Sequence, residues 1–331
     1  MCCLASASTP ALIESFHTVI DTHTAGDPMR DGVVWTNLTR SEIAAALGQE
    51  GFEVSTTVVD RLLDKFDFRQ RKAQRIKTMG ESADRDAQFR KIGKLKGRYL
   101  KAGLPVLSID GKKREILGDY VRPGRVLSTA PLRGWDHDFP QRRLGIAIPH
   151  GIYDVGRNEG YVHLGTSHDT SDFVIDSMLH WWRHHGVYQY HGAEGVLALF
   201  DSGGTSGCRS VRFKDGLQRF ADLTGLTVRV AHYPTHCSKY NPIEHRLFPH
   251  ITRACQGVLL ESVEMLKSLM QKTSTRTGLR VFVDIVNKFY QTGLKLPQFI
   301  RTSLRTRFDR LLPLWNYVVV PVPGEEYWEV I

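Results

Sequence analysis

The chain has 331 residues, of which 41% are hydrophobic and 24% charged, as expected for a soluble globular protein with one large or two ordinary domains. Its net charge of +9 favours an anionic partner, most often nucleic acid. No run of 18 apolar residues is present, which excludes a membrane-spanning helix. The five cysteines form no CxxC pair, so a disulfide framework is not expected and a cytoplasmic location is favoured.

Residues 1–35 are of mixed character. Pro10 to Ile20 could form one helix, and the segment HTAGDPMRDG (23–32) has the composition of a loop. The pattern sharpens after this segment.

Residues 36–68 predict two short helices joined by a turn. Thr39 is placed to cap the first helix, with Glu42 three residues later as in a capping box, and Gly51 ends it. The second helix starts at Ser55. Such a helix-turn-helix segment is common in DNA-binding proteins, and Thr56, Thr57 and Arg61 are expected on its exposed face. The alternative is an ordinary helical hairpin.

Residues 69–104 carry many cations. Phe89, Ile92 and Leu95 share one face of a predicted helix, so Arg90 and Lys94 face elsewhere. A solvated helix face and a basic linker that follows DNA phosphates both fit this stretch.

From residue 105 the period changes to that of strands. Strand-like runs occur at 105–110, 114–120, 145–155 and 160–167, and are followed by a helix (168–186), a strand (195–201), a helix (211–225) and a strand (226–234). The early strands can pair antiparallel, whereas the later ones need helical crossovers. The order predicts an α/β fold with a ribonuclease-H-like mixed sheet flanked by helices and preceded by a small all-α helix-turn-helix segment.

Three carboxylates fall at the ends of predicted strands or at the start of a predicted helix. Asp110 ends the first, central strand, Asp201 ends the strand expected beside it, and Glu244 opens the helix after the last strand. Ligand sites lie outside the carboxyl ends of adjacent strands, and converging acids require a cation. Oxygen-only ligands suit Mg²⁺ or Mn²⁺, and such ions support phosphodiester chemistry.

Other interpretations remain open at this point. In SKYNPIEHRLF (238–248), Asn241 and Pro242 have the signature of a helix start. Glu244 would then fall in the first turn, where the helix dipole favours a carboxylate without any metal. Asp169 is best explained as a helix cap, a place that Thr170 could also take. A zinc site at His232, His236 and Cys237 has no second ligand pair. The remaining competing carboxylates are Asp119, Asp136, Asp138 and Asp154.

Several motifs resemble the DDE transposases of bacterial insertion sequences, in particular the Rhodopirellula-type family, over residues of about 26 to 318. They are LSIDGKKREILGDY, HDF, GIAIPHGIYDVGRNEGYVHLGTSHDTSDFVIDSMLHWW, DSGGTSG, LQRFADLTGLTVRVAHYP and SKYNPIEHRLF. The mariner-like elements are more distant relatives of that family. The resemblance implies a ribonuclease-H-like catalytic domain in which Asp110, Asp201 and Glu244 are the catalytic, metal-binding triad for Mg²⁺ or Mn²⁺.

The resemblance also implies partners and supporting residues. The partners are double-stranded DNA at the element ends and at the target, with a homo-oligomer formed on DNA and no membrane. The residues expected to contact DNA or support the acids are Lys112, Lys113, His168, Lys239, Asn241 and His245. The implied organisation is an N-terminal remnant (1–35), a helix-turn-helix segment (36–68), a basic helical linker (69–104), the catalytic domain (105–318) and a C-terminal tail (319–331).

Two departures from the family pattern are visible in the motifs. Gly111 follows Asp110 where a bulkier residue is more common, and Ser202 follows Asp201 where Gly is usual. Members of the family usually carry a further N-terminal helix-turn-helix region, and the resemblance implies that the residues before GDPM are a remnant of it, so a shortened chain is expected. The sequence therefore predicts a DNA transposase that cuts and joins strands at insertion-sequence ends, and the alternatives are a DNA-binding, catalytically silent or truncated derivative and a ribonuclease-H-like nuclease of the host.

Overall fold

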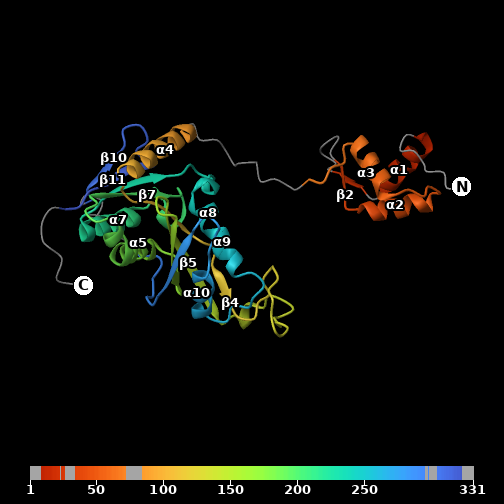
Figure 1. Cartoon of the computed structure of the whole chain (residues 1–331). Coiled ribbons are helices and arrows are strands. Elements are labelled where there is room, and N and C mark those ends of the chain that lie inside the picture. Colours follow the sequence, from red (N-terminus) through yellow and green to blue (C-terminus); the bar gives the residue numbers. More distant parts are fainter. Residues whose placement is uncertain are drawn as a thin grey trace. The chain divides into compact units, whose positions relative to one another are not determined.

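The computed structural model describes residues 9–22, 24–26, 34–71, 84–294, 297 and 304–322. The chain divides into two compact units, residues 1–77 and 78–331. They are called here the N-terminal unit and the sheet unit, and both are drawn in Figure 1. None of the described helices is long and apolar enough to cross a membrane.

The N-terminal unit is a small helical core with a two-stranded ribbon. Its elements are α1 (Pro10–Thr22), β1 (Thr24–Gly26), β2 (Val34–Thr36), α2 (Arg40–Gln49) and α3 (Thr56–Lys65). The predicted helix near residues 10–20 is present, but residues 24–26, expected in a loop, pair antiparallel with residues 34–36. The rest of the expected loop lies outside the described residues.

The two helices predicted from residues 39 and 55 are confirmed. Thr39 and Glu42 form the reciprocal capping box, and Ser55 is the N-cap position of α3. A single apolar core joins all three helices, so α1 packs with the helix-turn-helix segment rather than apart from it. That core contains Leu12, Phe16, Val19, Ile20, Ile43, Leu47, Val59 and Leu62.

The sheet unit begins with a helix and continues with a long mixed sheet. Its strands are β3 (Val106–Gly111), β4 (Glu115–Leu117), β5 (Gly145–Asp154), β6 (Glu159–Gly165), β7 (Gly195–Phe200), β8 (Thr227–His232), β9 (Arg280–Val286), β10 (Thr306–Phe308) and β11 (Asn316–Val319). Its α-helices are α4 (Arg85–Lys101), α5 (Ser171–Trp181), α6 (Val187–Gln189), α7 (Val211–Thr224), α8 (Ile243–Arg246), α9 (Phe248–Ala254) and α10 (Val263–Gln271). Short helical turns are η1 (Pro140–Arg142), η3 (Gly204–Ser206) and η4 (Ser238–Tyr240), and η2 (Trp182–Gly186) is a π-helix.

The strand order confirms the predicted ribonuclease-H-like arrangement. The sheet runs β10-β11-β8-β7-β3-β5-β6-β9, and β4 pairs with β5 off this path. Strand β3 lies parallel to β7 and antiparallel to β5, and β7 lies parallel to β8. The central segment β6-β5-β3-β7-β8 therefore has three antiparallel strands followed by two that need helical crossovers.

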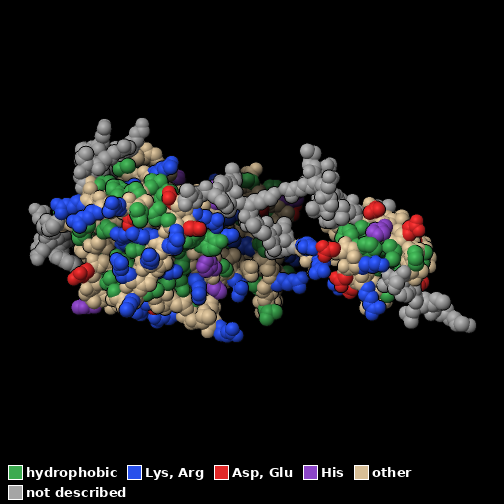
Figure 2. Space-filling view, turned by 90° about the horizontal axis from the view of Figure 1, so that it is seen from above, with side chains coloured by type: hydrophobic (Ala, Val, Ile, Leu, Met, Phe, Trp, Pro, Cys, Tyr) green, Lys and Arg blue, Asp and Glu red, His purple; other side chains and the backbone are tan. Residues whose placement is uncertain are grey.

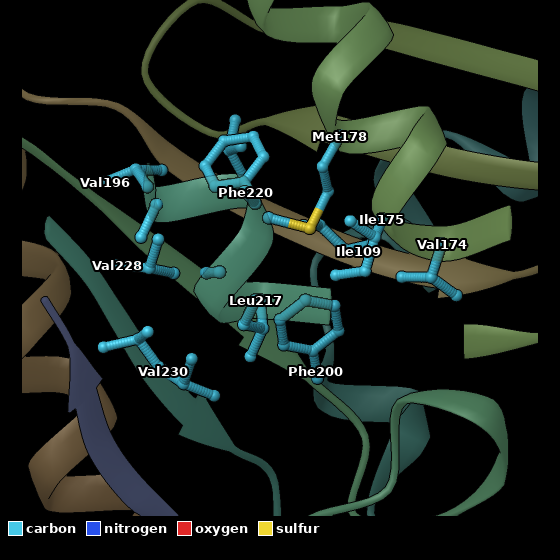
Figure 3. Close-up of a cluster of buried hydrophobic side chains, with 14 of the residues drawn as sticks. Ile109, Val174, Ile175, Met178, Val196, Phe200, Leu217, Phe220, Val228 and Val230 are labelled. Carbon is cyan, nitrogen blue, oxygen red and sulfur yellow. The ribbon is translucent and has the colours of Figure 1, made fainter. Parts of the chain in front are cut away.

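Helices cover both faces of this sheet. Helices α5 and α7 pack on one face, where Met178, Leu217 and Phe220 meet Ile109 and Phe200 (Figure 3). On the other face, α8, α9 and α10 cover the side of β5, β6 and β9, through Ile243, Leu247, Phe248, Ile251, Leu266 and Met270.

Helix α4 covers the rest of that second face. Its apolar residues Ile92 and Leu95 pack with Val106, Leu199 and Tyr233 of the sheet side. The carboxylate of Asp309 near β10 pairs with Lys91 at 2.5 Å. The helix expected within the basic linker is therefore part of the packed sheet unit, and residues 72–83 before it lie outside the described residues. The predicted tail also lies largely outside them, from residue 323 onward.

Two further expectations need correction. The helix of residues 168–186 does not end at Gly186, because η2 widens the turn there and α6 continues to Gln189. The run 114–120 forms only the three-residue strand β4, since Gly118 has a φ of 128° and its backbone bonds to Leu260 instead of to β5. Helix α7 does end at Gly225 as predicted, in the left-handed conformation that glycine adopts without strain.

Candidate active site

Asp110 and Asp201 lie at the same edge of the sheet on adjacent strands. Asp110 is the penultimate residue of β3, and Asp201 directly follows Phe200 at the end of β7. The two strands are parallel, so their carboxyl ends open to the same crevice. The predicted adjacency of these two carboxylates is thus what the fold produces.

Glu244 reaches this edge from helix α8, which packs on the sheet. It is the second residue of α8, which follows η4 and the Asn241–Pro242 turn. Its carboxyl group lies within hydrogen-bonding reach of Asp110. The structure therefore brings together all three of the predicted acids.

The role predicted for Asn241 is wrong in its details. Pro242 occupies the N-cap position and makes no side-chain cap. The Asn241 side chain is fully buried, accepts a hydrogen bond from the Ser108 hydroxyl and directs its amide nitrogen to the Asp201 carboxylate at 3.4 Å. The N–H of Ile243 is capped instead by the Ser108 hydroxyl, at 2.9 Å. Asn241 thus connects strands rather than capping a helix.

The acids repel one another in this setting. Burial, the Asp201 charge and Glu244 together raise the pKa of Asp110 to about 8, although the Gly111 N–H opposes this by donating to it at 2.8 Å. Burial and Glu244 raise the pKa of Asp201 to about 6, and burial also raises the pKa of Glu244. A nearby cation would relieve this cost, because it favours the ionised form of every carboxylate.

The donor set fits hard divalent ions. All three side chains offer carboxylate oxygens, which Mg²⁺ and Mn²⁺ prefer. In the described residues, the one group of three side chains with ligand atoms mutually within 4.8 Å is His163, His180 and Asp284, so the three acids are spread more widely. This spread suits Mg²⁺, which binds through one or two carboxylates and keeps waters and substrate oxygens as its other ligands.

Asp169, which precedes α5, lies close to Gly111, the residue after Asp110. Of the two residues expected to cap this helix, Thr170 is the cap, because its hydroxyl accepts from the N–H of Phe173, and the preference for Asp169 is wrong. The Asp169 carboxylate accepts from Thr205 at 3.4 Å, and its second oxygen lies 3.5 Å from where a Cβ on Gly111 would stand.

The other competing groups have structural partners or lie elsewhere. Asp154 is buried and accepts from the Tyr190 hydroxyl at 2.6 Å. His232, weighed as a zinc ligand, bonds to the Asp201 carbonyl and to the Tyr317 hydroxyl. Both of its ring nitrogens are thus engaged in the core.

The residues expected to contact DNA differ in accessibility. Thr56, Thr57 and Arg61 are exposed on α3, and Lys113 and Lys239 are exposed near the acid site. Lys112 is mostly buried and forms an ion pair with Glu115. His168 bonds to the Tyr290 carbonyl at 2.9 Å, and His245 is exposed beside Glu244.

Comparison with known proteins identifies the family. The model of the family described as "Rhodopirellula transposase DDE domain" matches residues 15–321. No curated protein matches the chain.

Some solved structures show a weak likeness. A Mos1 transposase paired-end complex with the left transposon end has 14% identity and a TM-score of 0.44, over 81% of this chain and 71% of that chain. Mos1 paired-end complexes with Mn and with Mg have 16% and 17% identity, TM-scores of 0.42 and 0.44, and cover 77% and 76% of this chain and 69% and 68% of those chains.

The family match spans nearly all of the described structure. It includes the sheet and the edge where Asp110, Asp201 and Glu244 meet. The chain therefore belongs to the Rhodopirellula-type transposase DDE-domain family and is a DDE-type DNA transposase.

Proposed function

We propose that Asp110, Asp201 and Glu244 are the catalytic acids of this transposase and hold Mg²⁺ or Mn²⁺. The observation that carries the proposal is the meeting of three half-buried carboxylates at one sheet edge, where the pKa of Asp110 is raised to about 8. Such a cluster is costly without a cation and stable with one. When bound, the ions would supply Lewis-acid stabilisation of charge on the attacking and leaving oxygens.

The residues themselves have separate tasks in this proposal. Asp110 lies in β3, whose first four residues are buried, and Asp201 directly follows the fully buried β7, so both carboxylates would be held in place relative to the DNA phosphate. Glu244 closes the site from α8. Asn241 holds Asp201 through its amide and leaves the other carboxylate oxygen free for a ligand.

The reaction proposed is hydrolysis of the phosphodiester at each element end, followed by attack of the freed 3′ hydroxyl on target DNA. Both steps are in-line displacements at phosphorus, and they use the same acids in turn. A catalytically silent derivative is not favoured, because all three acids are present and lie together.

DNA would be held largely by cations. On the face in Figure 2, Lys and Arg side chains are spread widely over the sheet unit, and acidic side chains are few. Helix α4 exposes Arg90, Lys94 and Arg98, whereas its apolar face is buried. We propose that these cations, with Lys113 and Lys239, follow the phosphate backbone, and that α3 reads the element end.

Several features of the cellular setting are also proposals. Two DNA ends must be brought together for strand transfer, which favours a homo-oligomer formed on DNA. The buried cysteines Cys208, Cys237 and Cys255 are free thiols, as a reducing cytoplasm would keep them.

The experiment that tests the catalytic assignment is cleavage of labelled element-end DNA by three variants. Asp110→Asn, Asp201→Asn and Glu244→Gln should each lower the cleavage rate more than about 100-fold, since each removes a ligand charge. DNA affinity should change little. Asp138→Asn, which lies in the exposed segment before β5, is the matched control. Cleavage at near wild-type rate in any of the three variants would remove that residue from the site.

A further inference from the structure

A second cluster of metal-binding side chains lies away from the acids. One ligand atom from each of His163, His180 and Asp284 lies within 4.8 Å of the others. The three come from β6, α5 and β9, respectively. His163 and Asp284 are direct cross-strand neighbours in the sheet.

This cluster is on the opposite face of the sheet from the acids. Residues Gly111, His150, His163 and Asp284 form one row across four neighbouring strands. Because side chains alternate along a strand, Asp110 points to the face that α8 covers, whereas the row that begins at Gly111 points to the face of α5. The two groups of ligands are therefore separated by the sheet.

The two histidines of this row, His150 and His163, are buried with few hydrogen-bond partners. The two facing ring nitrogens of His163 and His180 are 3.0 Å apart, and the Nδ1 of His163 has no hydrogen-bond partner. His150, its neighbour in the sheet, is buried with neither ring nitrogen bonded. The facing nitrogens, His163 Nε2 and His180 Nδ1, are the pair that an ion would bind, whereas the unpaired Nδ1 of His163 is buried at a cost in free energy.

Both candidate ligands are in the state that binds metals. Burial and the neighbouring histidines lower the pKa of His163 well below its usual range, and burial likewise lowers the pKa of His180. The imidazoles are thus neutral at physiological pH, so no proton has to leave before an ion binds.

We propose that His163, His180 and Asp284 bind a first-row transition-metal dication, of which Zn²⁺ is the best fit. Imidazole nitrogens with one carboxylate suit Zn²⁺ rather than Mg²⁺ or Ca²⁺. With Zn–N bonds of about 2.0–2.1 Å, two nitrogens of a tetrahedral site lie roughly 3.3 Å apart, close to the spacing found here. The exposed His184, whose ring centroid is 4.2 Å from that of His180, or a water completes the set.

The ion would fasten the end of the sheet. Strand β9 is the last strand of the described order, where it pairs with β6 and has no strand on its other side. An ion held by His180, His163 and Asp284 links this edge strand directly to α5 across β6. The site would therefore stabilise the fold without taking part in strand cleavage.

Lys267 provides an internal test of this assignment. Its ammonium lies 3.3 Å from an Asp284 carboxylate oxygen. It therefore already neutralises part of the negative charge that would attract a dication. Replacing it with the uncharged Lys267→Met should tighten metal binding. A purely structural role of the cluster predicts no such gain.

Titration of the full-length protein with Co²⁺ tests the site. The protein is first stripped with chelator and then held in excess Mg²⁺, which occupies the acid site. Binding should give the visible absorption of tetrahedral Co²⁺ with nitrogen ligands, and Zn²⁺ should abolish it by displacement. We expect His180→Gln and Asp284→Asn each to weaken binding by at least about tenfold. Lys267→Met should strengthen it severalfold, and the exposed His191→Gln should leave it unchanged.

The proposal fails if wild type, His180→Gln and Asp284→Asn bind Co²⁺ and Zn²⁺ equally, or if Asp201→Asn alone removes the signal. Thermal unfolding provides a second measurement, because Zn²⁺ should raise the melting temperature of wild type more than that of Asp284→Asn. Asp284→Asn keeps the shape of the side chain, so it decides the question even if a histidine variant does not fold.

Discussion

The Ser108 hydroxyl donates a hydrogen bond to the side-chain oxygen of Asn241, which lies 133 residues later in the chain. The same hydroxyl accepts from the N–H of Ile243, and the Asn241 amide nitrogen faces both the Ile109 carbonyl and the Asp201 carboxylate. One buried pair thus connects β3, the end of β7 and the start of α8. These are the three elements that carry Asp110, Asp201 and Glu244.

Removing this connection should loosen the acid site. Asn241→Ala and Ser108→Ala each leave a buried polar group unpaired, so the free energy of unfolding should fall by about 1–3 kcal/mol. The cleavage rate should fall as well, and half-maximal activity should need more Mg²⁺, because the acids are less well positioned. Denaturant titration and cleavage assays across a Mg²⁺ series measure both effects.

Ser128→Ala is the control, since Ser128 is exposed and bonds only within its own loop. If Asn241→Ala loses stability but keeps the wild-type Mg²⁺ dependence, the pair supports the fold and does not position the acids.

The Asn241 segment also illustrates which features a sequence can predict. Its Asn-Pro-x-Glu pattern correctly placed the start of a helix and Glu244 in its first turn, because such signals are local. The partner that determines the Asn241 side chain, Ser108, is remote, and only the folded sheet brings the two together. The capping box of Thr39 and Glu42 was predicted in full, since both of its partners lie within four residues.

The same reasoning explains the outcome for the acids and for the metal cluster. Strand periodicity placed Asp110 and Asp201 at strand ends, and the topology rules then made them neighbours. No such rule pairs β6 with β9, which are about 120 residues apart, so the row that contains His163 and Asp284 could not be predicted. The largely exposed segment of residues 119–144, between β4 and β5, likewise carries no periodicity from which to predict its course.

Asp110→Asn should stabilise the metal-free protein at alkaline pH. Folding raises the pKa of Asp110 from an ordinary value of 3.8 to about 8. At a pH between these two values, the Asp110 carboxyl group of the folded protein therefore holds a proton that the unfolded chain releases. Stability from this group is therefore present at low pH and is lost as pH rises through this range. The variant lacks the group, so its advantage over wild type should grow from pH 5 to pH 9.

Urea unfolding in chelator at pH 5, 7 and 9 measures this difference. Asp138→Asn is the control for loss of one exposed carboxylate. An advantage of Asp110→Asn that stays constant or shrinks with rising pH would show that Asp110 does not carry the proton.

Divalent ions should reverse the repulsion among the acids. Mg²⁺ or Mn²⁺ should raise the melting temperature of chelator-treated wild type and restore its cleavage activity, because oxygen ligands favour hard ions. The stabilisation should be larger at pH 8 than at pH 6, since the metal competes with the protons of Asp110 and Asp201. It should be much reduced in Glu244→Gln. Full activity in chelator, or equal stabilisation of Glu244→Gln, would contradict the metal assignment.

Helix α3 and the lysines near the acids should differ in how they bind DNA. Arg61 is exposed on α3, whereas Val59 and Leu62 are buried in the core of the N-terminal unit, so the helix presents one polar face for base contacts. Arg61→Ala should weaken binding to DNA from the element end by about 1–3 kcal/mol and weaken binding to random duplex much less. Lys113→Ala should weaken both by a similar factor and reduce the slope of log affinity against log salt by about 1. Arg40→Ala is the matched control, because this exposed arginine of α2 is paired with Asp60 at 2.6 Å.

Fluorescence anisotropy with both duplexes across a salt series measures these effects. Equal losses on the two duplexes for Arg61→Ala would show that α3 contacts phosphates and that the element end is read elsewhere.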